Sequence, residues 1–234
     1  MKIIKIITIV LISTQISLGL LIPLSQNPSN FWQFPIVTGL EEKIRNIIFH
    51  VPTAWVTMIA FLVSLFYAVL YLTKNKIEYD IKSTVSAEIG LLFCILATVT
   101  GSIWAKFNWG SFWNWDPRET SIFILLLIYT AYFALRSAIS DKIKKARLSS
   151  VYAILAGLTT PFFIFILPRL AGGLHPGSKG DVEGSGPIVE FKMPANMLLI
   201  FFIGLIGFTL LYFWMLNLRT RLMLLENKFN LMED

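Results

Sequence analysis

Long apolar runs alternate with short charged segments along this chain of 234 residues. A helix needs about 20 mostly apolar residues to cross a bilayer, and six runs qualify. The pattern therefore predicts an all-α, polytopic membrane protein that forms a single membrane domain over residues 1–234. The six predicted transmembrane helices cover about residues 4–24, 47–72, 85–104, 119–136, 151–170 and 194–216.

The first apolar run follows Lys2 and Lys5, an arrangement that is also typical of signal peptides. The run is longer than the about 7–15 residues of a signal-peptide core, and no small-x-small cleavage site is evident. We therefore interpret it as a retained helix.

Composition agrees with a membrane protein, since 56% of the residues are hydrophobic, 15% are charged and the mean hydropathy is +0.69. Soluble domains usually carry about 25% charged residues. The formal net charge of +6 does not indicate nucleic acid, because the basic residues lie between apolar runs and not on one compact face. The single cysteine, Cys94, lies within an apolar run, so we expect a buried packing role and exclude an internal disulfide.

The distribution of Lys and Arg predicts the orientation of the chain in the membrane. Thirteen of these residues lie in the two termini and in the loops at 74–83 and 136–149. The other seven lie in the loops at 25–46, 105–118 and 171–193. Cytoplasmic loops carry the excess of positive charge, so both termini are predicted to be cytoplasmic. In a bacterium the remaining loops then face the periplasm, and their unusual composition places the expected function there.

Aromatic residues crowd into an external Trp-rich segment at 104–118, which holds four of the seven tryptophans. Trp enrichment at a membrane interface is common, so an aromatic belt is one interpretation. Trp109, Phe112 and Trp113 would share a face if the loop were helical, and a broad aromatic surface suits a flat, apolar ligand. The density of aromatics, which includes Trp115, favours such a ligand platform over a belt.

The end of this segment reads as the start of a helix. Asp116 has the character of an N-cap, Pro117 suits the first helical position and Glu119 stands at the third. Arg118 would then lie near the outer interface, where it pairs either with Glu119 or with an anionic ligand group.

The chain has two histidines, His50 at the start of the second apolar run and His175 after the fifth. Both are predicted on the side of the Trp-rich segment, next to prolines that restrict the backbone. Two neutral imidazoles from separate parts of a chain can ligate one haem iron. Zinc would need further ligands close by, and no HxxxH, HExxH or cysteine partner exists.

Other chemistry is poorly supported by the sequence. No Gly-x-Ser-x-Gly elbow or P-loop is present, so hydrolase and ATPase activities are not indicated, and Gly184-Ser-Gly reads as a flexible loop. The apolar runs carry almost no charge, apart from Glu88, so a proton-coupled carboxylate relay is absent as well.

The string Trp109-Gly-Ser-Phe-Trp113-Asn-Trp115-Asp116-Pro-Arg-Glu-Thr120 closely resembles the tryptophan-rich signature of the haem-handling proteins of cytochrome c maturation, CcmC, CcmF and CcsA. The chain length and the six-helix plan resemble the CcmC family. His50-Val-Pro52-Thr-Ala-Trp55 and Leu174-His175-Pro176 resemble the stretches that carry the two external histidines of that family.

The resemblance implies that His50 and His175 are axial ligands of a non-covalently bound, b-type haem. It implies that Trp109, Trp113, Trp115 and Asp116 form the surface against which haem packs, and that Arg118 neutralises a propionate. It further implies transfer of haem to a CcmE-like chaperone at the outer face of the inner membrane, with CcmA, CcmB and CcmD as further partners.

Two alternatives stay open at this point. The Asp-Pro and Glu of the motif resemble the CcsA version, which corresponds to a haem lyase subunit that attaches haem to apocytochrome thiols. A permease subunit with an aromatic belt and no cofactor is the alternative from a different class.

Overall fold

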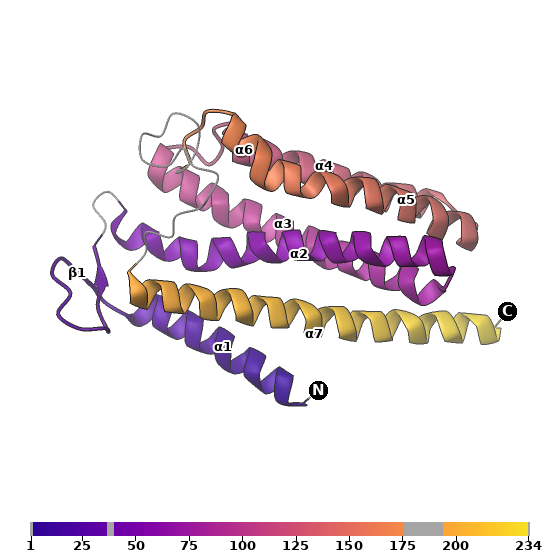
Figure 1. Ribbon diagram of the computed structural model, residues 1–234, viewed down its shortest axis with the longest axis horizontal. Coiled ribbons are helices and arrows are strands. Elements are labelled where there is room, and N and C mark those ends of the chain that lie inside the picture. The colour runs from indigo at the N-terminus through magenta and orange to yellow at the C-terminus, as the bar shows by residue number, and fades with distance from the viewer. Residues whose placement is uncertain (1, 37–39, 176–193, 234) are drawn as a thin grey trace.

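The computed structural model describes residues 2–36, 40–175 and 194–233, with side chains as far as residue 229 (Figure 1). Within these ranges, six helical segments are long and apolar enough to cross a membrane. The predicted all-α, six-span architecture is therefore confirmed. The main helices are α1 (Lys2–Leu21), α2 (Arg45–Lys74), α3 (Ile77–Trp109), α4 (Pro117–Ala138), α5 (Lys142–Pro161), α6 (Leu167–Leu170) and α7 (Ala195–Glu233).

Short elements complete the description. A 3₁₀ turn, η1 (Glu41–Ile44), leads into α2, and a π-helical turn, η2 (Phe162–Ile166), joins α5 to α6 within one continuous span. The strands β1 (Leu24–Ser25) and β2 (Phe34–Pro35) pair in parallel in the segment between α1 and α2.

Several helices extend beyond the apolar runs from which they were predicted. α3 begins at Ile77 and α5 at Lys142, so most of the charged connectors expected at 74–83 and 136–149 are helical. Hydropathy marks the part of a helix that lies in hydrocarbon, whereas backbone hydrogen bonding continues into water wherever the termini are satisfied. Asn75 ends α2 in the left-handed conformation with a φ of 52°, and the Asp141 side chain caps α5.

The helices form three layers, with α2 and α3 in the middle, α4 and α5 on one side, and α1 and α7 on the other (Figure 1). Phe61 of α2 stacks on Tyr129 of α4 with ring centroids 3.4 Å apart. Cys94 is fully buried in the same cluster, which confirms its expected packing role. Tyr212 of α7 lies in a second cluster, against α2 and α3.

A buried amide in α1 compensates for a proline in α2. Pro52 has no N–H, so it leaves the carbonyl of Ile48 without its helical donor. The Nε2 of Gln15, a fully buried side chain, donates to this carbonyl. Gly204 of α7 makes room for the amide, because a Cβ there would lie 2.5 Å from Gln15 Nε2. α1 is thus joined to α2 by a polar contact inside an apolar bundle, and α7 packs closely against the same amide.

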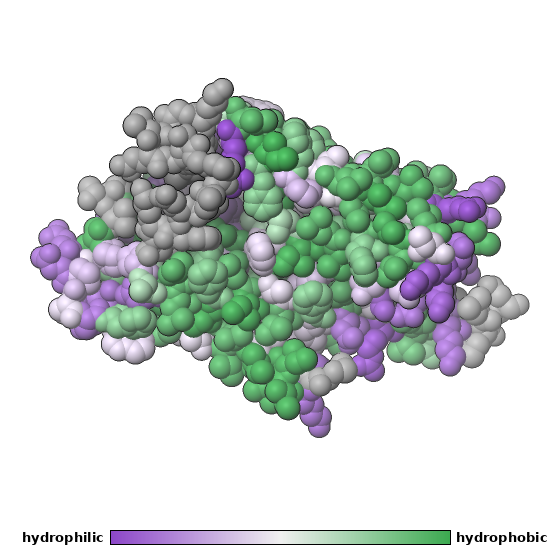
Figure 2. Space-filling view, in the orientation of Figure 1, coloured by the Kyte–Doolittle hydropathy of each residue, from purple (hydrophilic) through white to green (hydrophobic). Residues whose placement is uncertain are grey.

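The surface agrees with a multi-pass membrane protein. Figure 2 shows hydrophobic residues along most of the visible face, with hydrophilic residues gathered toward the two ends. Large apolar side chains such as Leu155, Leu158 and Ile206 are more than half exposed, as expected for contact with lipid. At the end opposite the histidines, Arg136 of α4 forms a buried bidentate ion pair with Asp80 of α3, at 2.7 and 3.0 Å.

Candidate functional site

The Trp-rich segment divides where α3 ends. Trp109 is the last residue of α3, and Gly110 terminates the helix in the left-handed region with a φ of 82°. The residues between Gly110 and Asp116 are irregular, so the condition under which Trp109, Phe112 and Trp113 would share a helical face is not met. The aromatics therefore form two separate groups.

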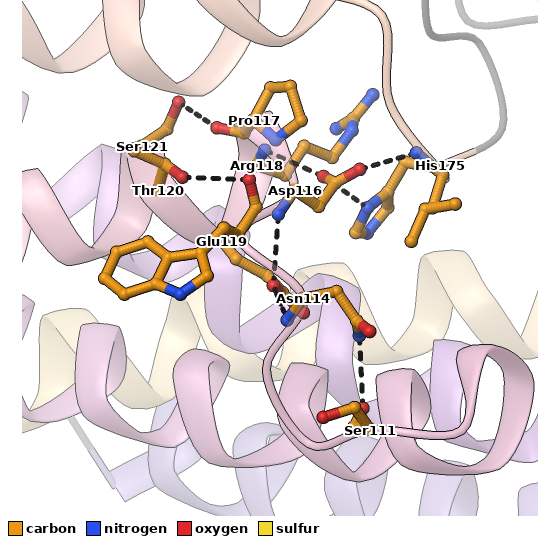
Figure 3. Close-up of polar contacts among 11 residues, drawn as sticks. Ser111, Asn114, Asp116, Pro117, Arg118, Glu119, Thr120, Ser121 and His175 are labelled. Atoms are coloured by element: carbon orange, nitrogen blue, oxygen red, sulfur yellow. Dashed lines mark hydrogen bonds and ion pairs between the residues drawn. The ribbon is translucent and has the colours of Figure 1, made fainter.

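Asp116 begins α4 as the sequence predicted. Its Oδ1 accepts from the Arg118 N–H at 2.9 Å, and Pro117 occupies the first helical position. Glu119 completes a capping box, with its Oε2 accepting from the N–H groups of Asp116 and Asn114 at 3.2 and 2.7 Å (Figure 3). Trp115, just ahead of the cap, has a φ of 57°, a conformation that is strained for a bulky residue.

The same carboxylate holds the segment that follows α6. Asp116 Oδ2 accepts from the Leu174 N–H at 2.6 Å, and Oδ1 lies 3.1 Å from His175 Nδ1 (Figure 3). Burial alone would raise the pKa of Asp116, but the hydrogen bonds from His175, Arg118 and Leu174 outweigh burial and lower it to about 2. The group is therefore an anion at neutral pH and accepts a hydrogen bond from His175 Nδ1–H.

His175 is held on two sides. Nδ1 faces Asp116, and the ring meets Trp109 edge to face with centroids 4.7 Å apart. Nε2 makes no recorded hydrogen bond within the described part of the chain. The imidazole therefore has a set tautomer, with its Nε2 lone pair available to a ligand.

His50 lies in the first turns of α2 and packs against α3. Its Nδ1 is 3.0 Å from Thr100 Oγ1, and its ring lies over Gly101, where a Cβ would come within 3.0 Å of His50 Cε1. The structure places His50 beside α3 and His175 beside the start of α4, both at the end of the bundle that carries the Trp-rich segment.

Arg118 is half-buried and lies beside Asp116 (Figure 3). Among the described residues, its buried Nε has no hydrogen-bond partner. Glu119 Oε2 serves the capping box, and no ion pair joins Arg118 to Glu119 among the described residues. A buried N–H group without an acceptor is costly, so the Nε of Arg118 is a candidate donor to a further group.

The second aromatic group contains Trp113, Trp115 and Phe123 of α4. Their rings meet edge to face, with centroid distances between 5.7 and 6.3 Å. Trp115 is 67% exposed and forms an outward apolar surface, unlike Trp109. Of the tryptophans predicted for the site, the structure therefore joins only Trp109 directly to a histidine.

Sequence reasoning missed the residues that support His50. Thr100 and Gly101 come from α3, and Asn46 of α2 donates to the Thr100 carbonyl at 2.9 Å, one turn before His50. The available signal was the run Thr98-Val-Thr100-Gly101-Ser102, which places small polar residues inside an apolar span. The flexible loop that the sequence predicts around Gly184 lies outside the described residues.

The fold and this site define a class of protein: a six-span membrane protein with two supported imidazoles, a tryptophan and a half-buried arginine at one end of the bundle. The chain belongs to the CcmC family, described as heme exporter protein C, whose family model matches residues 2–233. The resemblance drawn from the Trp-rich motif is confirmed, in favour of CcmC over CcsA.

Individual relatives agree with this assignment. The chain is 28% identical to "Heme exporter protein C" of Rhodobacter capsulatus over 202 residues, which cover 83% of this chain and 79% of that protein. It is 31% identical to the protein of the same name from Haemophilus influenzae, over 79% of this chain and 73% of the relative. The match to the protein of that name from Bradyrhizobium diazoefficiens is 32% identical, over 74% of this chain and 63% of the relative.

Proposed function

We propose that this protein binds haem between His50 and His175 and passes it to a CcmE-like haem chaperone during cytochrome c maturation. The observation that carries the proposal is that both imidazoles have the same ring nitrogen engaged in a hydrogen bond. Each Nδ1 faces a hydrogen-bond acceptor, Thr100 for His50 and Asp116 for His175. Each Nε2 is thereby left free to donate its lone pair to iron.

The donor set fits haem better than a simple metal ion. Within the described residues, no three His, Cys, Asp or Glu side chains gather in a way that could hold a metal ion. A porphyrin supplies four equatorial nitrogens of its own, so two axial imidazoles complete its coordination. A carboxylate behind a ligating histidine is a common supporting contact at metal sites, as Asp116 is behind His175.

Two further residues fit the periphery of a haem. Trp109, edge to face with His175, offers an apolar ring beside the proposed iron ligand. Arg118 offers a guanidinium whose buried Nε lacks a partner among the described residues, and a propionate is a suitable anion for it. Trp113 and Trp115 are proposed to supply the outer part of the aromatic surface.

The haem is proposed to be held without covalent attachment, as a b-type haem. Thioether linkage requires an accessible cysteine, and the only cysteine of the chain, Cys94, is fully buried in the helical core. A haem that is bound only through histidines and packing can be passed on, as a transfer protein requires.

The excess of Lys and Arg supports an orientation with both termini in the cytoplasm and the site at the periplasmic face of a bacterial inner membrane. The proposed partners are a CcmE-like chaperone that receives haem, together with CcmA, CcmB and CcmD. The described part of the chain contains no P-loop, so an ATPase partner must supply any work from ATP hydrolysis.

The test is the visible spectrum of protein purified from haem-replete cells. We expect the bands of a six-coordinate, low-spin haem in the wild type and their loss in a His50→Ala/His175→Ala double variant. Phe31→Leu, in an exposed aromatic at the same end of the bundle, is the matched control and should keep the spectrum. Unchanged haem in the double variant, or a colourless wild type, would overturn the proposal.

A further inference from the structure

The two histidines are supported by acceptors of different charge. His175 Nδ1 faces the Asp116 carboxylate at 3.1 Å, and His50 Nδ1 faces the Thr100 hydroxyl at 3.0 Å. The partner of His175 is a carboxylate, which can carry a negative charge, whereas the partner of His50 is a neutral hydroxyl. The site is therefore symmetric in geometry but unequal in electrostatics.

The hydroxyl of Thr100 is set to accept from His50. A threonine hydroxyl has one hydrogen, and that of Thr100 is directed to the Leu96 carbonyl at 2.8 Å, with a longer contact of 3.2 Å to Ala97. The lone pairs of Oγ1 then remain for an Nδ1–H of His50, and the Ala97 backbone also hydrogen-bonds His50. The Thr100 contact favours the tautomer with the proton on Nδ1 and the lone pair on Nε2.

The backbone around Thr100 keeps this contact in place. Asn46 Nδ2 donates to the Thr100 carbonyl at 2.9 Å, which joins α2 to α3 one turn before His50. Gly101 lets the imidazole lie against α3, since a Cβ at that position would approach His50 Cε1 to 3.0 Å. The three α2–α3 contacts hold the His50 ring in one orientation.

A carboxylate partner makes an imidazole a stronger donor to a metal than a neutral hydroxyl does, because negative charge behind Nδ1 raises the basicity of Nε2. We propose that Thr100 is the positioning residue of His50, and that His50 is the more weakly held of the two axial ligands and the first to release haem iron. In this step the bond between Nε2 and iron opens and both electrons stay on Nε2. No oxidant or reductant is needed. This inference rests on the proposed haem-binding function.

Thr100→Val tests the positioning role, because valine keeps the shape of threonine and removes the hydroxyl. We expect free imidazole to replace His50 in this variant at a concentration about ten-fold or more below that needed in the wild type, in line with other supporting contacts at metal sites. The readout is a spectral titration of the haem with imidazole. Thr100→Ser keeps the hydroxyl and should restore the wild-type midpoint.

Thr98→Val is the matched control for helix packing. Thr98 makes the same type of bond to the carbonyl four residues earlier, Cys94, at 2.8 Å, but has no recorded contact with His50. Its imidazole midpoint should equal that of the wild type. Equal midpoints in Thr100→Val and the wild type, or an equal shift in Thr98→Val, would overturn the role of Thr100.

The unequal strength of the ligands is tested with His50→Gly and His175→Gly, each assayed with and without imidazole. We expect His50→Gly to retain several-fold more haem without imidazole than His175→Gly, because the ligand backed by Asp116 remains. Equal retention, or the reverse order, would contradict the inference while leaving haem binding itself intact. Failure of the proposed function is distinguishable, because the wild type is then colourless or haem persists when both histidines are absent.

Discussion

Asp116 and His175 stand 59 residues apart in the chain and meet at 3.1 Å, where one carboxylate both caps α4 and orients an imidazole. The Asp116 side chain is only 1% exposed, so neither task is shared with water. The start of α4 and the histidine segment after α6 are consequently fixed relative to each other by one residue.

The variant Asp116→Asn separates the capping of α4 from the electrostatic support of His175. Asparagine is as good an N-cap as aspartate, so α4 should begin normally, but the charge behind His175 is lost. We expect about ten-fold weaker haem retention with little change in thermal stability. Asp141→Asn is the matched control, since Asp141 caps α5 through the Lys144 N–H at 2.7 Å without contacting the site. Haem loss of the same size in both variants would assign the effect to capping alone.

The pH dependence of the Asp116 contribution follows from its lowered pKa. The folded value of about 2 lies below the ordinary value of 3.8, so ionised Asp116 stabilises the fold fully above about pH 4. This contribution is lost as the pH falls from about 4 towards 2. We expect the difference in unfolding temperature between wild type and Asp116→Ala to shrink over that window. A difference that declines already between pH 7 and 5 would show that another group is responsible.

Gly101→Ala should disturb His50 without disturbing the bundle. The new Cβ would lie 3.0 Å from His50 Cε1, so the ring must shift away from Thr100. We expect a mixture of high-spin and low-spin haem in the visible spectrum in place of the low-spin form. Gly207→Ala crowds Ile12 to a similar degree, at 3.1 Å, and should leave the spectrum unchanged. Identical spectra for the two variants would contradict the proposed position of His50.

Arg118→Gln should remove the proposed partner of a propionate. A hydrogen bond to a charged group contributes about 1.5–3 kcal/mol, so haem binding should weaken by about ten-fold or more. Haem dimethyl ester lacks the carboxylates and should bind equally well to wild type and variant. Arg219→Gln, which removes an ion pair with Glu88 near the opposite end, is the control and should bind haem normally. A loss of ester binding equal to that of haem would show that Arg118 acts through packing.

Asp80→Asn should lower stability and spare the site. The variant leaves the Arg136 guanidinium buried beside a neutral amide, and breaking a buried ion pair costs about 3–5 kcal/mol. We expect a clearly lower unfolding temperature with an unchanged haem spectrum in the protein that remains folded. Replacing both residues, as Asp80→Leu/Arg136→Met, should recover much of the stability. Haem loss in folded Asp80→Asn would show coupling between the two ends of the bundle.

The fold was largely predictable because hydropathy over about 20 residues is a strong and local signal. The start of α4 was predictable for the same reason, since Asp116, Pro117 and Glu119 form a local pattern of capping residues. The full lengths of α3 and α5 were not predictable, because charged helical turns resemble charged loops in composition.

The residues of the candidate site were predictable from the sequence, but the hydrogen-bond partners of these residues were not. His50 and His175 were identifiable as the only two histidines, but their acceptors lie 50 and 59 residues away, and no local spacing encodes such contacts. The division of the tryptophans into two groups depends on one residue, Gly110, whose left-handed conformation ends α3. The positions of Trp113 and Trp115 followed from that turn and not from their spacing.

The contact between Gln15 and Ile48 joins α1 to the part of α2 that carries His50. The Ile48 carbonyl, two residues before His50, has lost its helical donor to Pro52 and receives one from α1 instead. Cleavage that removed α1 would leave this carbonyl facing hydrocarbon, beside a proposed iron ligand. The Gln15 amide thus completes the backbone hydrogen bonding of α2 beside the proposed iron ligand.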